Sequence, residues 1–552
     1  MSRIARQLAA ALAIVVAVLG LSTGIASAHA SVITSTPVDG QSVPTSPSEI
    51  SVTFSENVST LSGGLSVLNA DGKSVALEPT QIVNGRTLTA APSTTLTDGT
   101  YVVTYRVLSA DGHPVNGSLL FGVGAGALDR SAKPAATDDS TWESVGTLSR
   151  FLLALSALVA AGTAFFLAFV HDRAPDRWRI VPFVRIGTIL ALFGAIGVVM
   201  SQAALLTGKG AGASTDTNVL RDVLSENLGW SIALLMIGLA VVHLSTDISA
   251  TKVSRAFALT GGLAVTASFA VWGHASELAP RALSLLADFV HATAAALWLG
   301  GIVGLAMVLT LRSADAVAST AQILGRFSMV ALVSVIALII AGTTLTLTGS
   351  GEHLGSLLTT TWGQLVVAKI ALTAIIILLA AWNRRSLVPA IVEPTTDPAV
   401  RADRWHSLLR TVRIEALVIV VVIGLTSVLV NTPPARTAVV SKVSPVAITK
   451  RVDTGEITLS VSPAIVGPNR IETVMTDGTG QPFGVANTMT LEFSQPSAGL
   501  EPITRQVSAT SPGVFVYDGN ELSIPGDWNI TIAIRTGDFS EQRTSFEVPV
   551  RR

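Results

Sequence analysis

The sequence contains no cysteine among its 552 residues. This absence excludes disulfide scaffolds, thiolate metal sites, iron–sulfur clusters and cysteine nucleophiles. Charged residues are also scarce: they make up 13% of the chain, against about 25% in soluble globular proteins. The 36 basic and 37 acidic residues nearly cancel, so no basic excess is present that would attract nucleic acid. Any metal site here must be built from histidine, carboxylate, methionine or amine groups.

The first 28 residues have the pattern of a secretory signal peptide. Arg3 and Arg6 precede an apolar run over 8–21, and Ala26-Ser27-Ala28 matches the small-residue cleavage site. The alternative is an uncleaved anchor helix. Cleavage after Ala28 would make His29 the first residue of the mature chain, so that its α-amine and imidazole form a bidentate nitrogen chelate. It would also place the following domain outside the cytoplasm.

Residues 29–123 are predicted to form an all-β domain. Apolar and polar residues alternate along 50–54 and 101–105, and Asp-Gly turns separate the runs at short intervals. Several short strands with regular turns indicate a small sandwich or Greek-key barrel. Residues 124–147 begin with a Gly/Ala/Ser/Pro-rich run that is typical of a linker.

The hydrophobic content of 49% is concentrated between residues 148 and 431. Eight apolar stretches there are long enough to cross a bilayer, which predicts an eight-helix transmembrane domain. They lie near 148–170, 180–207, 228–245, 255–273, 284–310, 326–348, 364–382 and 412–431. Loops predicted to be cytoplasmic hold most of the basic residues, whereas the outer loops hold Lys209, Arg221 and Arg281. This bias predicts a multi-pass protein of the plasma membrane, with both ends of the mature chain outside.

Residues 440–552 become polar and alternating again. Val461 ends one alternating run and Trp528 begins another, with turn signals at Gly467-Pro468 and Asp477-Gly478. The pattern predicts a second β-sandwich, which would also lie outside the cytoplasm.

The strongest candidate site combines His29 with Asp111 and His113. Asp111 and His113 lie two residues apart after a predicted strand, so on extended backbone their side chains face the same way. With the terminal amine they offer nitrogen and carboxylate ligands, which suit Cu(II) in a tetragonal arrangement. The alternative is that Asp111-Gly112 is only a turn and His113 a surface residue.

Four stretches of this region resemble the CopC copper-binding domain. They are His29-Ala30-Ser31, Ser35-Thr36-Pro37-Val38-Asp39-Gly40, Phe54-Ser55-Glu56 and Ser109-Ala110-Asp111-Gly112-His113-Pro114-Val115. The resemblance implies a Cu(II) site in which His29 and His113 form a histidine brace and Asp111 completes it. Glu56 is a further neighbour of that site. Some CopC domains carry a Met-rich Cu(I) site, which is not expected here because residues 30–140 contain no methionine.

The transmembrane region resembles CopD, a partner often fused to CopC, as in YcnJ-like proteins of copper import and resistance. The matching stretches are Gly273-His274-Ala275, Asp288…His291…Trp298-Leu299-Gly300-Gly301, Gly363-Gln364…Lys369 with Asn383-Arg384, and Arg413-Ile414-Glu415 before Thr432-Pro433-Pro434. The C-terminal region, with Pro525-Gly526-Asp527-Trp528 and Arg535, resembles YtkA-like domains. The resemblance implies a chain that captures Cu(II) outside, passes it to the helices and is not an enzyme.

Asp288 and His291 share one helical stripe with Trp298, which makes them candidates for a copper path together with His274 at its outer mouth. Copper would cross as Cu(I), so a copper reductase or chaperone is a candidate partner. The alternative for these side chains is interfacial anchoring, and Lys369 is expected to extend to the outer interface.

Two other functions remain open from the sequence. His171 and His243 could ligate haem in a membrane oxidoreductase, or the bundle could anchor a periplasmic copper buffer without transport. No P-loop is present in the sequence, so ATP-driven transport by this chain is not expected. Oligomeric state is left open.

Overall fold

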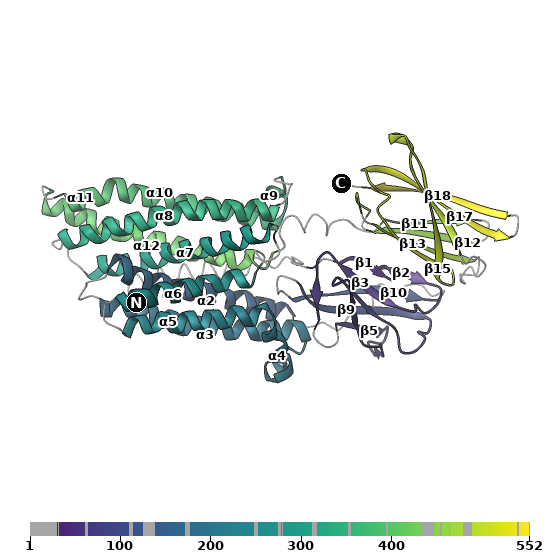
Figure 1. Ribbon diagram of the computed structural model, residues 1–552, viewed down its shortest axis with the longest axis horizontal. Helices are drawn as coiled ribbons and strands as arrows, with labels where there is room; N and C mark the ends of the chain where they lie inside the picture. The colour runs from purple at the N-terminus through teal and green to yellow at the C-terminus, as the bar shows by residue number, and fades with distance from the viewer. Residues whose placement is uncertain are drawn as a thin grey trace. The chain divides into compact units, whose positions relative to one another are not determined.

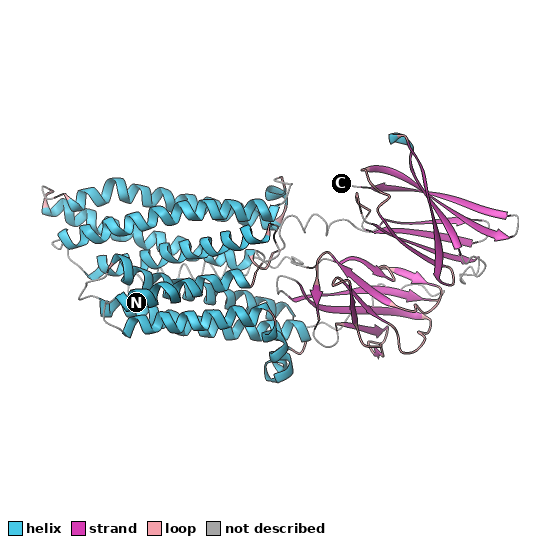
Figure 2. Cartoon of the chain, in the orientation of Figure 1, coloured by secondary structure: helices cyan, strands magenta, loops and turns pink. Residues whose placement is uncertain are grey.

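The computed structural model describes residues 30, 32–60, 64–109, 114–124, 139–171, 177–247, 252–273, 278, 280–311, 317–350, 355–393, 396–432, 446–452, 455–462, 464–467, 469–477, 488–537 and 540–550. The chain divides into two compact units: the helices fall in one and the strands of both β regions in the other (Figure 1). Figure 2 shows the long helices and the strands in separate units, with one short helical turn, Pro496–Ala498, among the strands.

The N-terminal β region consists of two sheets. The first has the order β1 (Val32–Thr36), β3 (Ile50–Phe54), β8 (Thr87–Ala90), β7 (Gln81–Val83). The second has the order β2 (Gln41–Val43), β10 (Pro114–Val123), β9 (Gly99–Ser109), β5 (Leu65–Asn69), β6 (Ser74–Val75), with β4 (Val58–Ser59) paired to β9. Alternate residues such as Val52 and Phe54 are fully buried in the shared core. The predicted all-β domain is confirmed.

Among the described residues, the helical unit contains eight helices that are long and apolar enough to cross a membrane. They are α2 (Asp139–Phe165), α3 (Arg177–Thr207), α5 (Asn227–Asp247), α6 (Lys252–Val271), α7 (Arg281–Leu311), α8 (Val317–Ser350), α10 (Thr361–Trp382) and α12 (Pro398–Leu429). Shorter helices are α4 (Thr217–Ser225), α9 (Ser356–Thr359) and α11 (Val388–Val392). Helices α2 and α10 each continue into a π-helical turn, at Phe166–Val170 and Asn383–Leu387. The eight predicted spans are confirmed.

Several helices expose large apolar side chains on the surface of the bundle. Helices α8 and α10 carry many of them, and α3 carries a further row. Examples are Phe193, Val333, Ile340, Ile370 and Leu378, each more than half exposed. An apolar surface of this extent fits a bilayer, in which such exposure has no hydrophobic penalty.

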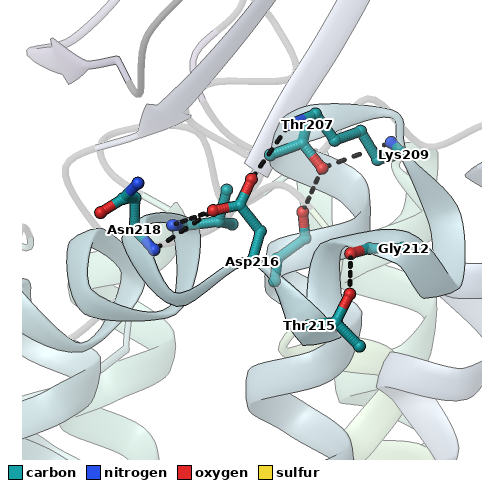
Figure 3. A network of polar contacts seen from close by, with 8 residues as sticks. Thr207, Lys209, Gly212, Thr215, Asp216 and Asn218 are labelled. Carbon is teal, nitrogen blue, oxygen red and sulfur yellow. Dashed lines mark hydrogen bonds and ion pairs between the residues drawn. The ribbon is translucent and has the colours of Figure 1, made fainter.

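The loop between α3 and α5 is held by a compact polar network (Figure 3). Asp216 caps α4 by accepting from the amides of Asn218 and Val219, and its other oxygen accepts from Lys209 Nζ at 3.1 Å. The hydrogen bond from Lys209, together with those amides, holds the pKa of Asp216 below its ordinary value. One of the basic residues in the predicted outer loops is therefore paired locally.

The C-terminal β region forms one antiparallel sheet of eight strands. Its order is β11 (Val446–Val452), β12 (Gly455–Ser462), β13 (Asn469–Asp477), β16 (Val514–Gly519), β15 (Leu500–Ser511), β14 (Thr488–Gln495), β17 (Gly526–Gly537), β18 (Ser540–Val550). The outermost strands β11 and β18 contact each other, and Lys450 Nζ donates to the Ser545 carbonyl at 2.7 Å. The sheet thus nearly closes around a core that includes Trp528 and Phe493. The predicted second β-sandwich is confirmed as a β-rich region, whose strands form one nearly closed sheet rather than two separate sheets.

Candidate functional site

The strand register of the N-terminal β region brings three chain segments to one end of the domain. Val32, where β1 begins, pairs with Phe54, where β3 ends. Val58, where β4 begins, pairs with Ser109, where β9 ends, and β10 starts beside it at Pro114. Because only a few residues separate Phe54 from Val58, these pairings lie close together. This end therefore gathers the entry to β1, the β3–β4 connection and the β9–β10 connection.

The residues predicted to bind Cu(II) belong to these same segments. Glu56 lies in the β3–β4 connection and is half-buried. His29, Asp111 and His113 lie outside the described residues: the first directly precedes Ala30, and the other two fall within the β9–β10 connection. Ala30 is 1% exposed and belongs to the core, which fixes the chain just before β1. Within the described residues, no group of three His, Asp or Glu could hold a metal ion.

In the bundle, the candidate residues Asp288 and His291 of α7 are both half-buried. The His291 ring lies against α8: a Cβ added to Gly342 would lie 3.4 Å from His291 Cε1 and 3.6 Å from Nδ1. Nδ1 is buried and has no hydrogen-bond partner among the residues that the structure describes. His274, the third candidate of this path, lies outside the described residues.

Lys369 of α10 belongs to the same neighbourhood. Its side chain is half-buried, its charge acts on His291, and the charge of Asp288 acts on it in turn. The expectation that Lys369 simply extends to the outer interface is incomplete, because the structure gives it two ionisable neighbours. A lysine beside an imidazole opposes binding of a cation unless a carboxylate offsets it, and Asp288 is placed to do so.

The glycines of the Trp298-Leu299-Gly300-Gly301 stretch serve helix packing. A Cβ on Gly300 would lie 2.0 Å from the carbonyl carbon of Gly162 in α2, and one on Gly301 would lie 2.3 Å from the ring of Phe327 in α8. Small residues allow such close approach of helices in membranes. Trp298 is 5% exposed and packs in the same core. This stretch therefore positions α7, and with it Asp288 and His291.

A second polar cluster joins α12 to the end of α10. Asn383 Nδ2 donates to Glu415 Oε1 at 2.6 Å, and Thr411 Oγ1 donates to Asn383 Oδ1 at 2.8 Å. The exposed fractions are 6% for Asn383, 4% for Glu415 and 8% for Thr411. The sequence offered Asn383 and Glu415 only as separate parts of a family resemblance, since nothing local indicates that they meet.

Comparison with known families assigns most of the chain. The CopC domain family matches residues 32–124, the N-terminal domain of copper resistance protein D-like proteins matches 140–280, and the copper resistance protein D family matches 321–429. Glu56, Asp111 and His113 lie within the CopC match and His274 within the 140–280 match, whereas His29, Asp288 and His291 lie outside the matched residues.

Individual relatives agree with these matches. The copper transport protein CutJ of Bacillus subtilis (strain 168) is 26% identical over 94% of this chain and 95% of its own. Copper resistance protein C of Pseudomonas syringae pv. tomato is 34% identical over 19% of this chain and 86% of its own. The crystal structure of CopC from Methylosinus trichosporium OB3b aligns with 17% of this chain and 93% of that chain, at 33% identity and a TM-score of 0.16.

The names of these families and relatives refer to copper transport or resistance rather than to catalysis. The C-terminal region lies beyond the family matches, so its likeness to YtkA-like domains stays a prediction. The eight spans and the matched families identify a multi-pass membrane protein. The chain belongs to the family of CopC–CopD fusion proteins, with a CopC domain followed by a CopD-type helical bundle.

Proposed function

We propose that this protein binds Cu(II) outside the cytoplasm and passes copper to its helical bundle for import. The observation that carries the proposal is the presence of CopC and CopD family domains in one chain. The proposed Cu(II) ligands are the amine and imidazole of His29, together with Asp111 and His113. Glu56, in the β3–β4 connection at the same end of the domain, is the neighbouring carboxylate.

The proposed copper path begins at His274 and continues along Asp288 and His291. Its support is the buried Nδ1 of His291, which can serve as a ligand, and the carboxylate of Asp288, which offsets the charge of Lys369. Histidine and methionine ligands within a membrane suit Cu(I), so reduction would precede translocation. A copper reductase or chaperone is the proposed partner.

The direction of transport follows from where capture occurs. The signal-peptide pattern, the eight spans and the basic loops together support a chain whose β regions both lie outside the cytoplasm. Capture outside by a chain without an ATP-binding motif favours import. A reporter fused after Arg552 that is active only inside the cytoplasm would overturn this topology.

Copper accumulation and membrane abundance, measured together, test the path. The variant His291→Ala should abolish accumulation per molecule and leave Cu(II) binding by the outer domain unchanged. The matched control is His406→Ala, because His406 is exposed at the start of α12. Wild-type uptake per molecule in both His291→Ala and Asp288→Asn would show that copper takes another route.

The same experiments separate the two alternative functions. A copper buffer anchored by a passive bundle would bind Cu(II) normally but give no uptake in vesicles. A haem oxidoreductase using His171 and His243 would show a Soret band in the purified protein. We therefore expect a protein without that band that binds one Cu(II) per chain.

A further inference from the structure

Glu415 is a carboxyl group buried inside the bundle, and no charged side chain pairs with it among the described residues. It lies near the middle of α12, and its side chain receives one hydrogen bond, from Asn383 Nδ2. No charged side chain acts on it in the part of the chain that the structure describes. A charged group in the middle of a membrane helix costs about 2.5–3.5 kcal/mol on insertion scales, and such groups are usually functional.

The basic residues close to Glu415 and Asn383 in the sequence have other partners or are exposed. Arg413 Nη2 donates to Thr310 Oγ1 at 3.3 Å, and Arg384 Nη1 donates to the Ser328 carbonyl at 3.4 Å. Arg385 is exposed. Among the residues that the structure describes, the group that acts on the carboxyl is the neutral amide of Asn383, which does not compensate a negative charge there.

The hydrogen bonds around Glu415 involve both ends of the Asn383 amide. Nδ2 donates to the carboxyl, and Oδ1 lies 2.8 Å from the Thr411 hydroxyl, which is also within reach of the Leu408 carbonyl of its own helix at 2.9 Å and of the Ser407 carbonyl at 3.2 Å. Both protonation states of Glu415 can accept that bond: the carboxylate through either oxygen, the acid through its carbonyl oxygen. The network can thus hold the ionised and the protonated form without rearrangement.

The local backbone is also unusual. Asn383 begins the π-helical turn Asn383–Leu387, which continues α10. Such turns are rare and occur frequently at functional sites. Here the turn begins at Asn383, whose side chain bonds to Glu415 of α12.

Glu415 is separate from the candidate copper path. Trp405 Nε1 donates to the Leu309 carbonyl at 3.1 Å, which sets α12 beside the end of α7. From that level, Glu415 lies about 15 Å along α12 and His291 about 27 Å along α7, at about 1.5 Å per residue. The two groups therefore occupy different depths, roughly 12 Å apart along the bundle.

We propose that Glu415 is a proton-binding site, and that it takes up and releases a proton in each transport cycle. This step rests on the proposed function, because it couples proton movement to copper movement. The chain has no P-loop motif, so a proton gradient would supply the driving force. Asn383 and Thr411 are positioning residues that hold the carboxyl in both forms.

Proteoliposomes that contain the full chain and a trapped pH indicator test the coupling. Copper(I) added outside should produce a proton flux with the wild type and with Glu415→Asp. Glu415→Gln keeps the shape and the bond from Asn383, and it should reduce the flux at least tenfold per molecule. The matched control is Glu393→Gln, since Glu393 is exposed after α11 and should leave the flux unchanged. Undiminished proton flux in Glu415→Gln, or copper uptake without proton flux in the wild type, would overturn the proposal.

Infrared spectroscopy tests Glu415 independently of transport. If no copper moves in the proteoliposomes, the proposed function fails, but the spectra still show whether Glu415 binds a proton. A buried carboxylic acid gives a C=O band that should appear on acidification of the wild type and be absent from Glu415→Gln. Asn383→Leu should move the pH at which the band appears, which a purely structural role of Asn383 would not do. Identical spectra of wild type and Glu415→Gln at every pH would exclude a proton site here.

Discussion

The two β regions of this chain are built from similar strands but differ in what their ends carry. In the N-terminal region, the register gathers the β1 entry, the β3–β4 connection and the β9–β10 connection at one end. These segments contain His29, Glu56, Asp111 and His113. The C-terminal region contains no histidine at all.

The C-terminal region uses its polar and sulfur-containing groups for structure instead. Met475 and Met489 are 2% and 1% exposed and belong to its core. Arg505 bridges Tyr517 and Glu521, and other arginines pair across strands. The two regions therefore differ in the residues at their strand ends, where the proposed Cu(II) ligands lie, rather than in their β architecture.

The largest expected difference between the two β regions is in the unfolding free energy after a core substitution in the C-terminal region. Trp528 is fully buried in the C-terminal core, and its Nε1 donates to the Ile524 carbonyl at 2.9 Å. Trp528→Ala should lower the unfolding free energy of residues 446–550 by about 3–5 kcal/mol, the usual cost of such a truncation. Denaturant unfolding measures this. Copper affinity of the N-terminal region should not change, and a parallel loss would show that the two regions depend on each other.

The next effect concerns metal binding. Substituting His113→Ala, or adding one residue before His29, should weaken Cu(II) binding by residues 29–125 at least about 100-fold, since even outer-shell changes cost 10–100-fold. The control fragment carries the added residue at its other end. A competitive titration measures the affinities. Comparable Cu(II) binding by residues 446–550, which have no imidazole, would abolish the distinction between the regions.

The sequence is sufficient to predict the three-part architecture, because hydropathy and strand alternation are local signals. It is not sufficient to predict which side chains meet inside the bundle. Lys369 lies near His291, and Asn383 bonds to Glu415, although 32 residues separate the second pair. Those pairings depend on which faces of the helices contact each other, and every bundle helix is apolar on most of its circumference.

The family motifs also do not distinguish residues of the proposed copper path from residues that only pack the helices. Gly300 was notable in the sequence as part of a CopD-like stretch that also contains the candidate ligand His291. The structure shows that Gly300 is required by the close approach of α2 at Gly162. A motif can therefore combine a residue of the proposed path with residues that only pack. The predicted Cu(II) ligands remain a prediction, because His29, Asp111 and His113 lie outside the described residues.

A smaller effect marks the N-terminal region at alkaline pH. Burial, with a contribution from the nearby charge of Asp39, raises the pKa of Tyr105 to about 12. Between about pH 10 and pH 12, Tyr105 therefore stays protonated in the folded state, whereas the unfolded chain releases that proton. Stability from this source is complete below about pH 10 and falls as the pH rises toward 12, by roughly 2 kcal/mol in total. Tyr105→Phe should remove this dependence, as unfolding measured across that pH range would show. An unchanged alkaline slope in that variant would mean that Tyr105 ionises freely.

The smallest effect belongs to the C-terminal region at acid pH. Burial alone would raise the pKa of Glu521, but hydrogen bonds from Tyr517 and Arg505 outweigh it and hold that pKa below its ordinary value. The bonds are 2.7 Å from Tyr517 Oη and 2.9 Å from Arg505 Nε to Glu521 Oε1.

Because the folded-state pKa is lowered, the stabilisation is present above the ordinary glutamate pKa and is lost as the pH falls through the folded value. The Arg505 side chain is 45% exposed, so solvent screening limits the contribution to less than about 1 kcal/mol. Glu521→Gln should therefore flatten the acid limb of the stability profile of residues 446–550. The matched control is Glu501→Gln, because Glu501 is exposed on the neighbouring part of the same sheet. Acid limbs that coincide in Glu521→Gln and the wild type would show that the Arg505–Tyr517–Glu521 network adds nothing to folding. In that case the charged groups of this network would neither bind copper nor stabilise the C-terminal region.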